Sequence, residues 1–114
     1  FYPRYFEILN DVVETFFAEV ANYPFCKIHP ENGVPTADLQ AQFQAPSWHG
    51  EILEIVFSLS RLGGSSATTR FVVTYQNKPR MTAQSVLVHV GPNRKSTPWP
   101  SHVRVALETL LEES

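Results

Sequence analysis

Four histidines and one cysteine are the side chains of this sequence best suited to metal binding or nucleophilic catalysis. His29, His49, His89 and His102 lie 20, 40 and 13 residues apart, which is not the short spacing of zinc-binding pairs. Cys26 is the single cysteine, so it is either a nucleophile paired with a distant histidine or a side chain that only packs. The spacing predicts no metal site, and packing is the simpler role for the cysteine.

The remaining chemical motifs are weak. Glu7, Asp11 and Glu14 share one face of a helical pattern. Such a face is usually solvated, although a carboxylate beside a cleft can also act as a general base. The pair Gly63-Gly64 could approach a phosphate, but a two-glycine hairpin turn explains it more simply. There is no G-x-S-x-G, Walker or G-x-G-x-x-G motif, so the commonest hydrolase and nucleotide-binding sites are excluded.

The composition is that of one ordinary globular domain, residues 1–114. Of its residues 43% are hydrophobic and 18% charged, enough for a core without disulfides. The net charge of −2 argues against a nucleic-acid partner. No apolar run approaches the ~20 residues of a membrane helix, and there is no signal-peptide pattern. We therefore expect a cytoplasmic protein without a membrane partner. Because the chain opens at Phe1 without a methionine, we also expect that its natural N-terminus has been trimmed.

Apolar residues at helical spacing predict one long helix over residues 3–21. The stripe consists of Phe6, Leu9, Val13, Phe16, Phe17 and Val20. Ile8 and Val12 widen the apolar arc, so we expect this helix to be packed on more than one side. The proline-rich residues 22–36 that follow have no period, which predicts a loop.

Alternating apolar and polar residues then predict four strands. They cover residues 37–43, 52–60, 69–76 and 82–90. The short links Gly63–Ser66 and Gln76–Pro79 are typical of turns between antiparallel neighbours. A proline-punctuated stretch, residues 92–100, leads to a short amphipathic helix. A sheet with one apolar face needs a cover, and the long helix is the obvious one, so the predicted fold class is α+β.

Several stretches, in this order, resemble one family. They are Phe1–Phe6 followed by Leu9-Asn10, Gly33–Thr36 with Asp38-Leu39, Ala45-Pro46 with Gly50–Leu53, Arg61–Ser66, and Thr97–Pro100. The chain looks like a hotdog-fold acyl-CoA thioesterase of the 4-hydroxybenzoyl-CoA thioesterase type. The resemblance implies an antiparallel sheet wrapped around a long central helix, with the N-terminal strand missing from this chain. It also implies hydrolysis of an acyl-CoA to a carboxylic acid and free CoA, no cofactor, and a homodimer or homotetramer with the site at the subunit boundary.

The resemblance assigns roles to individual residues. The backbone N–H of Tyr2 would bind the thioester carbonyl oxygen, and the catalytic aspartate would lie upstream of Phe1. The acyl group would be bound by Tyr5, Asn10, Val34, Pro35 and Thr36. CoA phosphates would be held by basic residues, for which we select Arg61, Arg70 and Arg80; Lys78, Arg94 and Lys95 are further candidates.

Two other functions fit the same pattern. One is a non-catalytic hotdog or helix-grip module that binds an acyl or other apolar ligand. The other is an interaction domain that dimerises through a sheet edge. An aspartate shortly before Phe1 would favour the enzyme, and a hydrophobic or basic residue there would favour binding.

Overall fold

A computed structural model describes residues 2–23, 33–45, 50 and 52–112, with residues 2–5 described as helical backbone. The chain begins with helix α1 (Tyr2–Thr15), which continues as a π-helical turn (Phe16–Val20). Four strands follow: β1 (Thr36–Phe43), β2 (Glu54–Leu62), β3 (Ser66–Tyr75) and β4 (Lys78–Val88). The 3-10 turn η3 (Pro92–Arg94) and helix α2 (Ser101–Glu108) complete the fold. The predicted order of helix, four strands and helix is confirmed.

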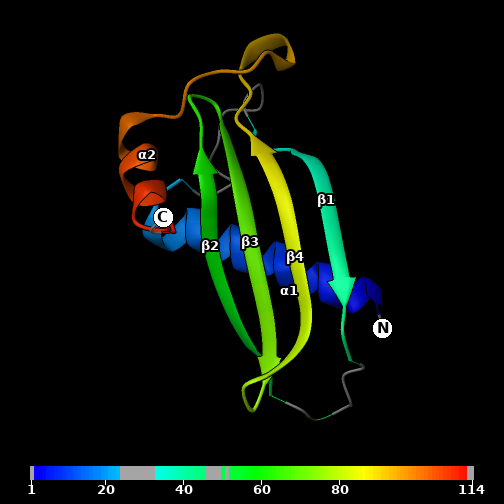
Figure 1. The fold of residues 1–114 in the computed structure, drawn as a ribbon. Helices are drawn as coiled ribbons and strands as arrows, with labels where there is room; N and C mark the ends of the chain where they lie inside the picture. Colours follow the sequence, from blue (N-terminus) through cyan, green and yellow to red (C-terminus); the bar gives the residue numbers. More distant parts are fainter. Residues whose placement is uncertain (1, 24–32, 46–49, 51, 113–114) are drawn as a thin grey trace.

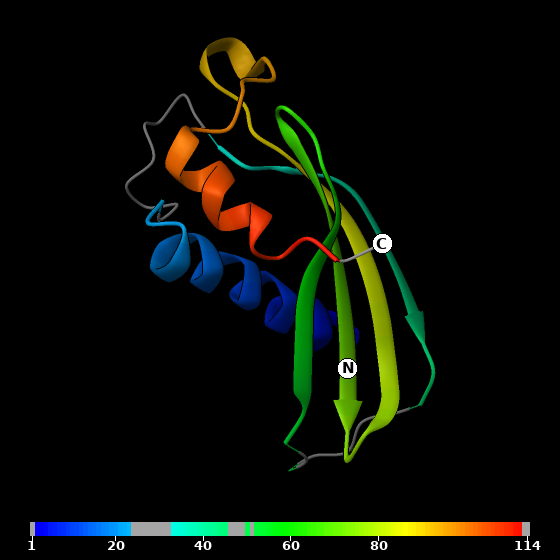
Figure 2. The ribbon, with the colours of Figure 1, turned by 60° about the vertical axis from the view of Figure 1, so that its left-hand side comes forward.

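The strands form one antiparallel sheet in the order β1-β4-β3-β2. Helix α1 crosses behind all four strands, and its N-terminal end reaches past β1 (Figure 1). Helix α2 lies on the same side of the sheet (Figure 2). We call the side that carries both helices the inner face and the opposite side the outer face. The predicted α+β class is confirmed, and its architecture is a sheet curved around a long helix.

The core lies between the inner face and the two helices. Helix α1 and its π turn supply Leu9, Val13, Phe16 and Phe17, all buried as the periodic pattern predicts. The sheet and α2 add Leu59, Phe71, Val73, Met81, Val103 and Leu107. Because aliphatic and aromatic side chains gain roughly 1.5–3 kcal/mol each on full burial, this contact fixes α1 on the sheet.

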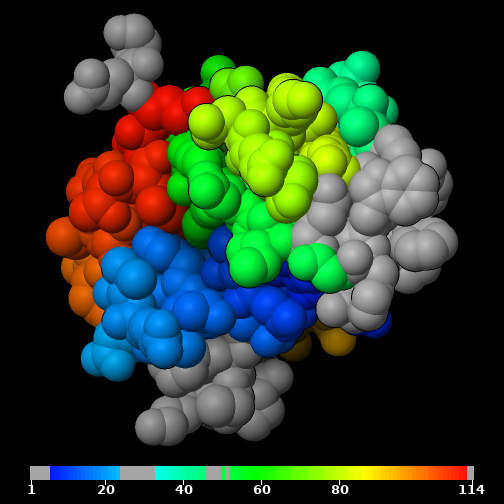
Figure 3. Space-filling view, turned by 90° about the horizontal axis from the view of Figure 1, so that it is seen from below, coloured from blue at the N-terminus to red at the C-terminus, as the bar shows by residue number. Residues whose placement is uncertain are grey.

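Among the residues that the structure describes, helix α1 is packed on only one side in a single chain, which differs from our expectation. Ile8 and Val12 are half-buried and line an open hollow of about 330 Å³ together with Asp11 and Thr15. In Figure 3 this helix, in blue, remains visible along the face seen from below. The wide apolar arc therefore leaves a second flank of α1 available for other contacts.

The hairpin between β3 and β4 is tighter than predicted. Lys78 and Pro79 belong to β4, which leaves Gln76 and Asn77 as a two-residue loop. Both loop residues have positive φ, 50° and 65°. Two consecutive left-handed residues characterise the turn whose twist matches that of the flanking strands. Asparagine tolerates this conformation well. The two strands therefore extend to Tyr75 and Lys78, although the sequence had placed Lys78 and Pro79 in the turn.

The described part of the chain contains no helix long and apolar enough to span a membrane.

Candidate thioester site at the start of helix α1

The start of α1 favours the binding of negative charge. The helix begins at Tyr2, so the first N–H groups of the helix lack partners within it. Aligned peptide dipoles add roughly half a positive charge at this end. The first turn contains no acidic residue that would neutralise this charge. An oxygen that becomes negative during a reaction would be stabilised here.

Phe6 and Phe43 fix the start of α1 against the end of β1. Their ring centroids are 6.5 Å apart with an interplanar angle of 77°, an edge-to-face contact. The backbone beyond Phe43 is held in turn, because the N–H groups of Gln44 and Ala45 both donate to the carbonyl oxygen of Arg80, at 3.0 and 3.3 Å. The helix start is therefore attached to the sheet at one corner.

Beyond Phe43, the described residues leave most of the inner face of β1 uncovered. Leu39, Ala41 and Phe43 share that face, since they lie opposite Ser85, Ala83 and Met81 of β4, all of them buried. Their β4 partners are covered by the core, but Leu39 keeps 45% of its surface exposed. The start of α1 and the inner face of β1 therefore border an apolar surface suited to an acyl chain or ring.

Asn10 lies one turn after Phe6 on α1. Its side-chain N–H donates to the Glu14 carboxylate at 3.3 Å, and both groups are exposed. An asparagine amide cannot remove a proton at neutral pH, whereas it can orient water or substrate by hydrogen bonding.

Val34, Pro35 and Thr36 lie at the opposite end of β1. Neighbouring Gly33 exchanges two backbone hydrogen bonds with Val90, and the Pro35 carbonyl accepts one from the Val88 N–H at 3.1 Å. Seven residue steps separate Thr36 from Phe43, about 23 Å along a strand. Within one chain, the structure does not bring this segment to the start of α1.

The three selected arginines are also dispersed. Arg61 and Arg70 face outward from the sheet, and the Arg70 guanidinium forms an exposed ion pair with Glu112 at 3.2 Å. Arg80 lies over the Tyr75 ring at 5.1 Å, at the same end of the sheet as Phe43. Only Arg80 is therefore near the corner where α1 begins.

His89 is the centre of a buried hydrogen-bond network that the sequence did not predict. His89 is 1% exposed; its Nε2 pairs with the Tyr23 hydroxyl and its Nδ1 with the Thr97 carbonyl, both at 2.9 Å. Because a carbonyl can only accept, Nδ1 carries the proton and Nε2 accepts from Tyr23. The ring also stacks on Trp99 with centroids 5.3 Å apart. These contacts connect the segment after β4 to Tyr23, which follows the π-helical turn.

The other chemical candidates form no site in the described ranges. Within residues 2–23, 33–45, 50 and 52–112, no group of three or more His, Cys, Asp or Glu side chains could hold a metal ion. Gly63 and Gly64 form the β2–β3 turn, in which the Gly63 N–H donates to the Ser66 carbonyl at 2.8 Å. Cys26, His29 and His49 lie outside the described residues.

Comparison with known families and structures agrees with this geometry. Residues 2–107 match the model of the thioesterase-like superfamily. The chain belongs to this superfamily, and its fold is the hotdog fold predicted from the sequence. No curated protein matches it by sequence.

Three solved structures illustrate the likeness. A gentisyl-coenzyme A thioesterase is 25% identical, with a TM-score of 0.81 over 94% of this chain and 85% of its own. The 1,4-dihydroxy-2-naphthoyl-CoA thioesterase from Synechocystis is 16% identical, with a TM-score of 0.86 over 96% and 83%. The dynemicin thioesterase is 17% identical, with a TM-score of 0.89 over 100% and 86%. The two structures with the lower identities support the fold alone.

Proposed function

We propose that this chain is the hotdog unit of a cytoplasmic acyl-CoA thioesterase, which hydrolyses a thioester to a carboxylic acid and free CoA. The observation that carries the proposal is the position of the α1 N-terminus beside the uncovered inner face of β1. A positive helix end next to an apolar surface suits a substrate with a polar carbonyl and an apolar acyl group. Membership of the thioesterase-like superfamily supports the same reaction.

The N–H of Tyr2 is the proposed oxyanion donor. Water attacks the thioester carbonyl carbon, and the carbonyl oxygen becomes negative in the tetrahedral intermediate. A preorganised backbone donor stabilises that oxygen, and removing one such donor typically costs about 3–4 kcal/mol. The C–S bond then breaks, and the CoA sulfur leaves as a thiolate that takes up a proton. The aspartate that the family resemblance places upstream of Phe1 would activate the water, and Asn10 would position it.

Two copies of the chain complete the proposed site. β1 is an edge strand, and unpaired strand edges are generally covered in native proteins. Antiparallel pairing of β1 with β1 of a second copy, about a two-fold axis, would bring the Thr36 end of one copy beside the Phe43 end of the other. Val34, Pro35 and Thr36 would then line the acyl site that begins at the partner's α1, together with Tyr5. The assembly is at least a homodimer.

Arg80 is the proposed phosphate ligand for CoA, because it is the selected arginine nearest the start of α1. Arg61 and Arg70 lie on the other side of the sheet, where a bound coenzyme would have to wrap around an edge to reach them. An arginine at the mouth of the site would attract the phosphates and orient the thioester toward the helix start.

The proposal is tested by measuring release of free thiol from a panel of aryl- and alkyl-CoA esters, with the full-length protein. We expect turnover of at least one ester, with saturation kinetics. If esters bind, as measured by calorimetry, but none releases thiol, the chain is a binding module. If no ester binds, the acyl-CoA assignment is wrong.

A further inference from the structure

The buried His89 ring is the direct neighbour of Val34, a residue of the proposed acyl site. Gly33 pairs with Val90 in an antiparallel bridge. The next positions along the two segments, Val34 and His89, therefore lie opposite each other. Gly33 and Val90 exchange both of their backbone hydrogen bonds, and the residues of the pair that follows have Cα atoms only about 4.5 Å apart. The side chains of Val34 and His89 are thus close if they share a face.

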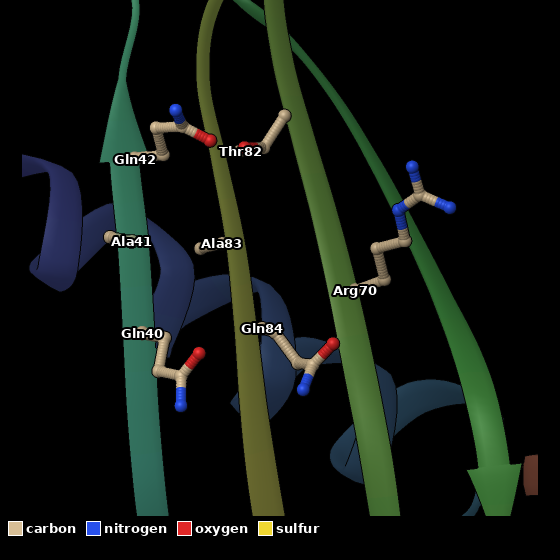
Figure 4. A pocket seen from close by; sticks show the side chains of 7 residues that line it. All are labelled: Gln40, Ala41, Gln42, Arg70, Thr82, Ala83 and Gln84. Atoms are coloured by element: carbon tan, nitrogen blue, oxygen red, sulfur yellow. The ribbon is translucent and has the colours of Figure 1, made fainter.

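Both side chains lie on the inner face of the sheet. Figure 4 shows the opposite side, where α1 lies behind the strands and Gln84 of β4 extends from the near, outer face. Because side chains alternate along a strand, Val88 shares the outer face with Gln84, and His89 lies on the inner face. Val34 shares the inner face with His89 and is half-buried against the core.

His89 is held firmly behind Val34. Its side chain is 1% exposed, and both ring nitrogens form hydrogen bonds, one with the Tyr23 hydroxyl and one with the Thr97 carbonyl, each at 2.9 Å. The ring also stacks on Trp99. A close-packed ring with all its hydrogen bonds formed resists displacement by a group that presses on it.

Trp99 is fixed in turn by three contacts. Its backbone N–H donates to the Gly64 carbonyl at 3.0 Å, and its indole N–H donates to the Ser66 carbonyl at 3.2 Å. Its ring stacks on Phe17, with centroids 6.0 Å apart. The indole is therefore attached both to the β2–β3 turn and to the π-helical turn after α1. We call the connected side chains of His89, Tyr23 and Trp99 the His89 wall.

We propose that the His89 wall limits the length of the acyl group. The inference rests on the proposed function and its dimer, in which Val34 of one copy lines the site that begins at the α1 of the other. Helix α1 crosses the strands and reaches past β1, so a carbonyl bound at its start lies toward the second copy (Figure 1). The acyl chain then meets Val34 of that copy, with His89 behind it. His89 acts through Val34 and is a positioning residue.

The strand spacing sets the depth of this site. In the second copy β1 lies one spacing inward from the partner's edge, and β4 with the segment that carries His89 lies two spacings inward, about 10 Å in all. An extended alkyl chain advances about 1.3 Å per carbon–carbon bond, because bonds of about 1.5 Å zigzag, so about eight carbons fill this depth. A longer chain would have to push Val34 into the His89 wall. The site should accept short acyl chains and reject long-chain fatty acyl groups.

A series of straight-chain esters from butyryl-CoA to palmitoyl-CoA measures the limit by thiol release. For the wild type we expect the highest kcat/KM at about eight carbons or fewer, and a fall of at least about tenfold by dodecanoyl-CoA, since one misfitting methylene alone can cost about 10- to 200-fold. Val34→Ala removes two methyl groups in front of the imidazole. It should raise kcat/KM for decanoyl- and dodecanoyl-CoA about tenfold, a gain that a loss of stability cannot produce.

Two further variants complete the test. Val34→Phe should shorten the limit by about two carbons or more, because the larger ring fills the end of the site. Val88→Ala is the matched control, since Val88 is also a half-buried valine beside this segment but lies on the outer face. It should keep the wild-type length profile. His89→Ala removes the wall itself and should extend the limit beyond that of Val34→Ala, in a protein that circular dichroism shows to be folded.

The outcomes separate the His89 wall from the proposed reaction. The wall is overturned if the wild type hydrolyses palmitoyl-CoA as well as octanoyl-CoA, or if both Val34 variants keep the profile of Val88→Ala. If no ester is hydrolysed, the proposed reaction is wrong, and dissociation constants of the same esters, measured by calorimetry, should show the same length limit and the same shifts. If the dissociation constants do not depend on chain length, or if no ester binds, the wall is overturned as well.

Discussion

Phe6 and Phe43 join the first turns of α1 to the last residue of β1, with their rings edge to face at 6.5 Å. The contact connects the proposed oxyanion donor, one turn upstream of Phe6, with the strand whose inner face would hold the acyl group. Because the two elements are fixed to each other, a carbonyl oxygen bound at the helix start has a defined position relative to the acyl surface.

Phe6→Ala should therefore reduce turnover more than it reduces stability. Phe6 is 38% exposed, so we expect a loss of only about 1–2 kcal/mol in the free energy of unfolding, less than the 3–5 kcal/mol of a fully buried phenylalanine. A misplaced donor should lower kcat about tenfold or more. Thiol release and urea denaturation measure the two effects. Val20→Ala, at the exposed far end of the same helix, serves as control and should change neither.

Two substitutions at Tyr2 distinguish the role of its backbone N–H from the role of its side chain. Tyr2→Phe retains the backbone donor and should keep kcat within about tenfold of wild type. Tyr2→Pro removes the donor and should lower kcat about 10²- to 10³-fold. Circular dichroism must show that the proline variant is folded. Unchanged turnover of a folded Tyr2→Pro protein would contradict the oxyanion role, and an inactive Tyr2→Phe would transfer the role to the phenol.

Leu39→Lys tests the acyl surface. Leu39 is half-exposed on the inner face of β1, so lysine can be accommodated without unfolding, but its ammonium group would lie where the apolar acyl group is proposed to bind. We expect the KM for acyl-CoA to rise about tenfold or more. Val105→Lys, at an exposed position on α2, is the matched control. Equal KM values for the two variants would remove Leu39 from the site.

His89 should matter for stability. His89→Phe keeps the ring stacked on Trp99 but leaves the Tyr23 hydroxyl and the Thr97 carbonyl without the partner that each has now. A fully buried group without a partner costs about 1–3 kcal/mol, and Tyr23 and Thr97 are only half-buried, so we expect a total loss of about 1–3 kcal/mol in the free energy of unfolding. His102→Phe, at an exposed site, should cost far less. Equal losses in denaturant titrations would show that the hydrogen bonds of His89 are unimportant.

The sequence predicted the elements better than their contacts. Periodicity identified α1 and the four strands, because one face of each is buried against the same core. It could not show that Arg61 lies on the side of the sheet opposite α1, since the bulge between Leu59 and Arg61 shifts the alternation by one residue. Arg70 is different, because regular alternation with Phe71 and Val73 already places it on that side. Nor could it pair His89 with Tyr23, 66 residues away, because no local pattern encodes a contact at that separation. Val34, Pro35 and Thr36 were assigned to the acyl site by resemblance. They lie far from the start of α1 within one chain, and the proposed pairing of two β1 strands would bring them beside the α1 of the second copy.

The most direct test of the shared site mixes two inactive variants. Tyr2→Pro removes the donor at the helix start, and Val34→Lys blocks the segment that a second copy would contribute. If the two parts meet across the dimer, a mixed pair contains one intact site and one doubly damaged site. Random reassociation of equal amounts should then restore about one quarter of wild-type thiol release, because half of the dimers are mixed and each has one of two sites intact. Thiol release no greater than the mean of the two separate variants would contradict a site built from both copies.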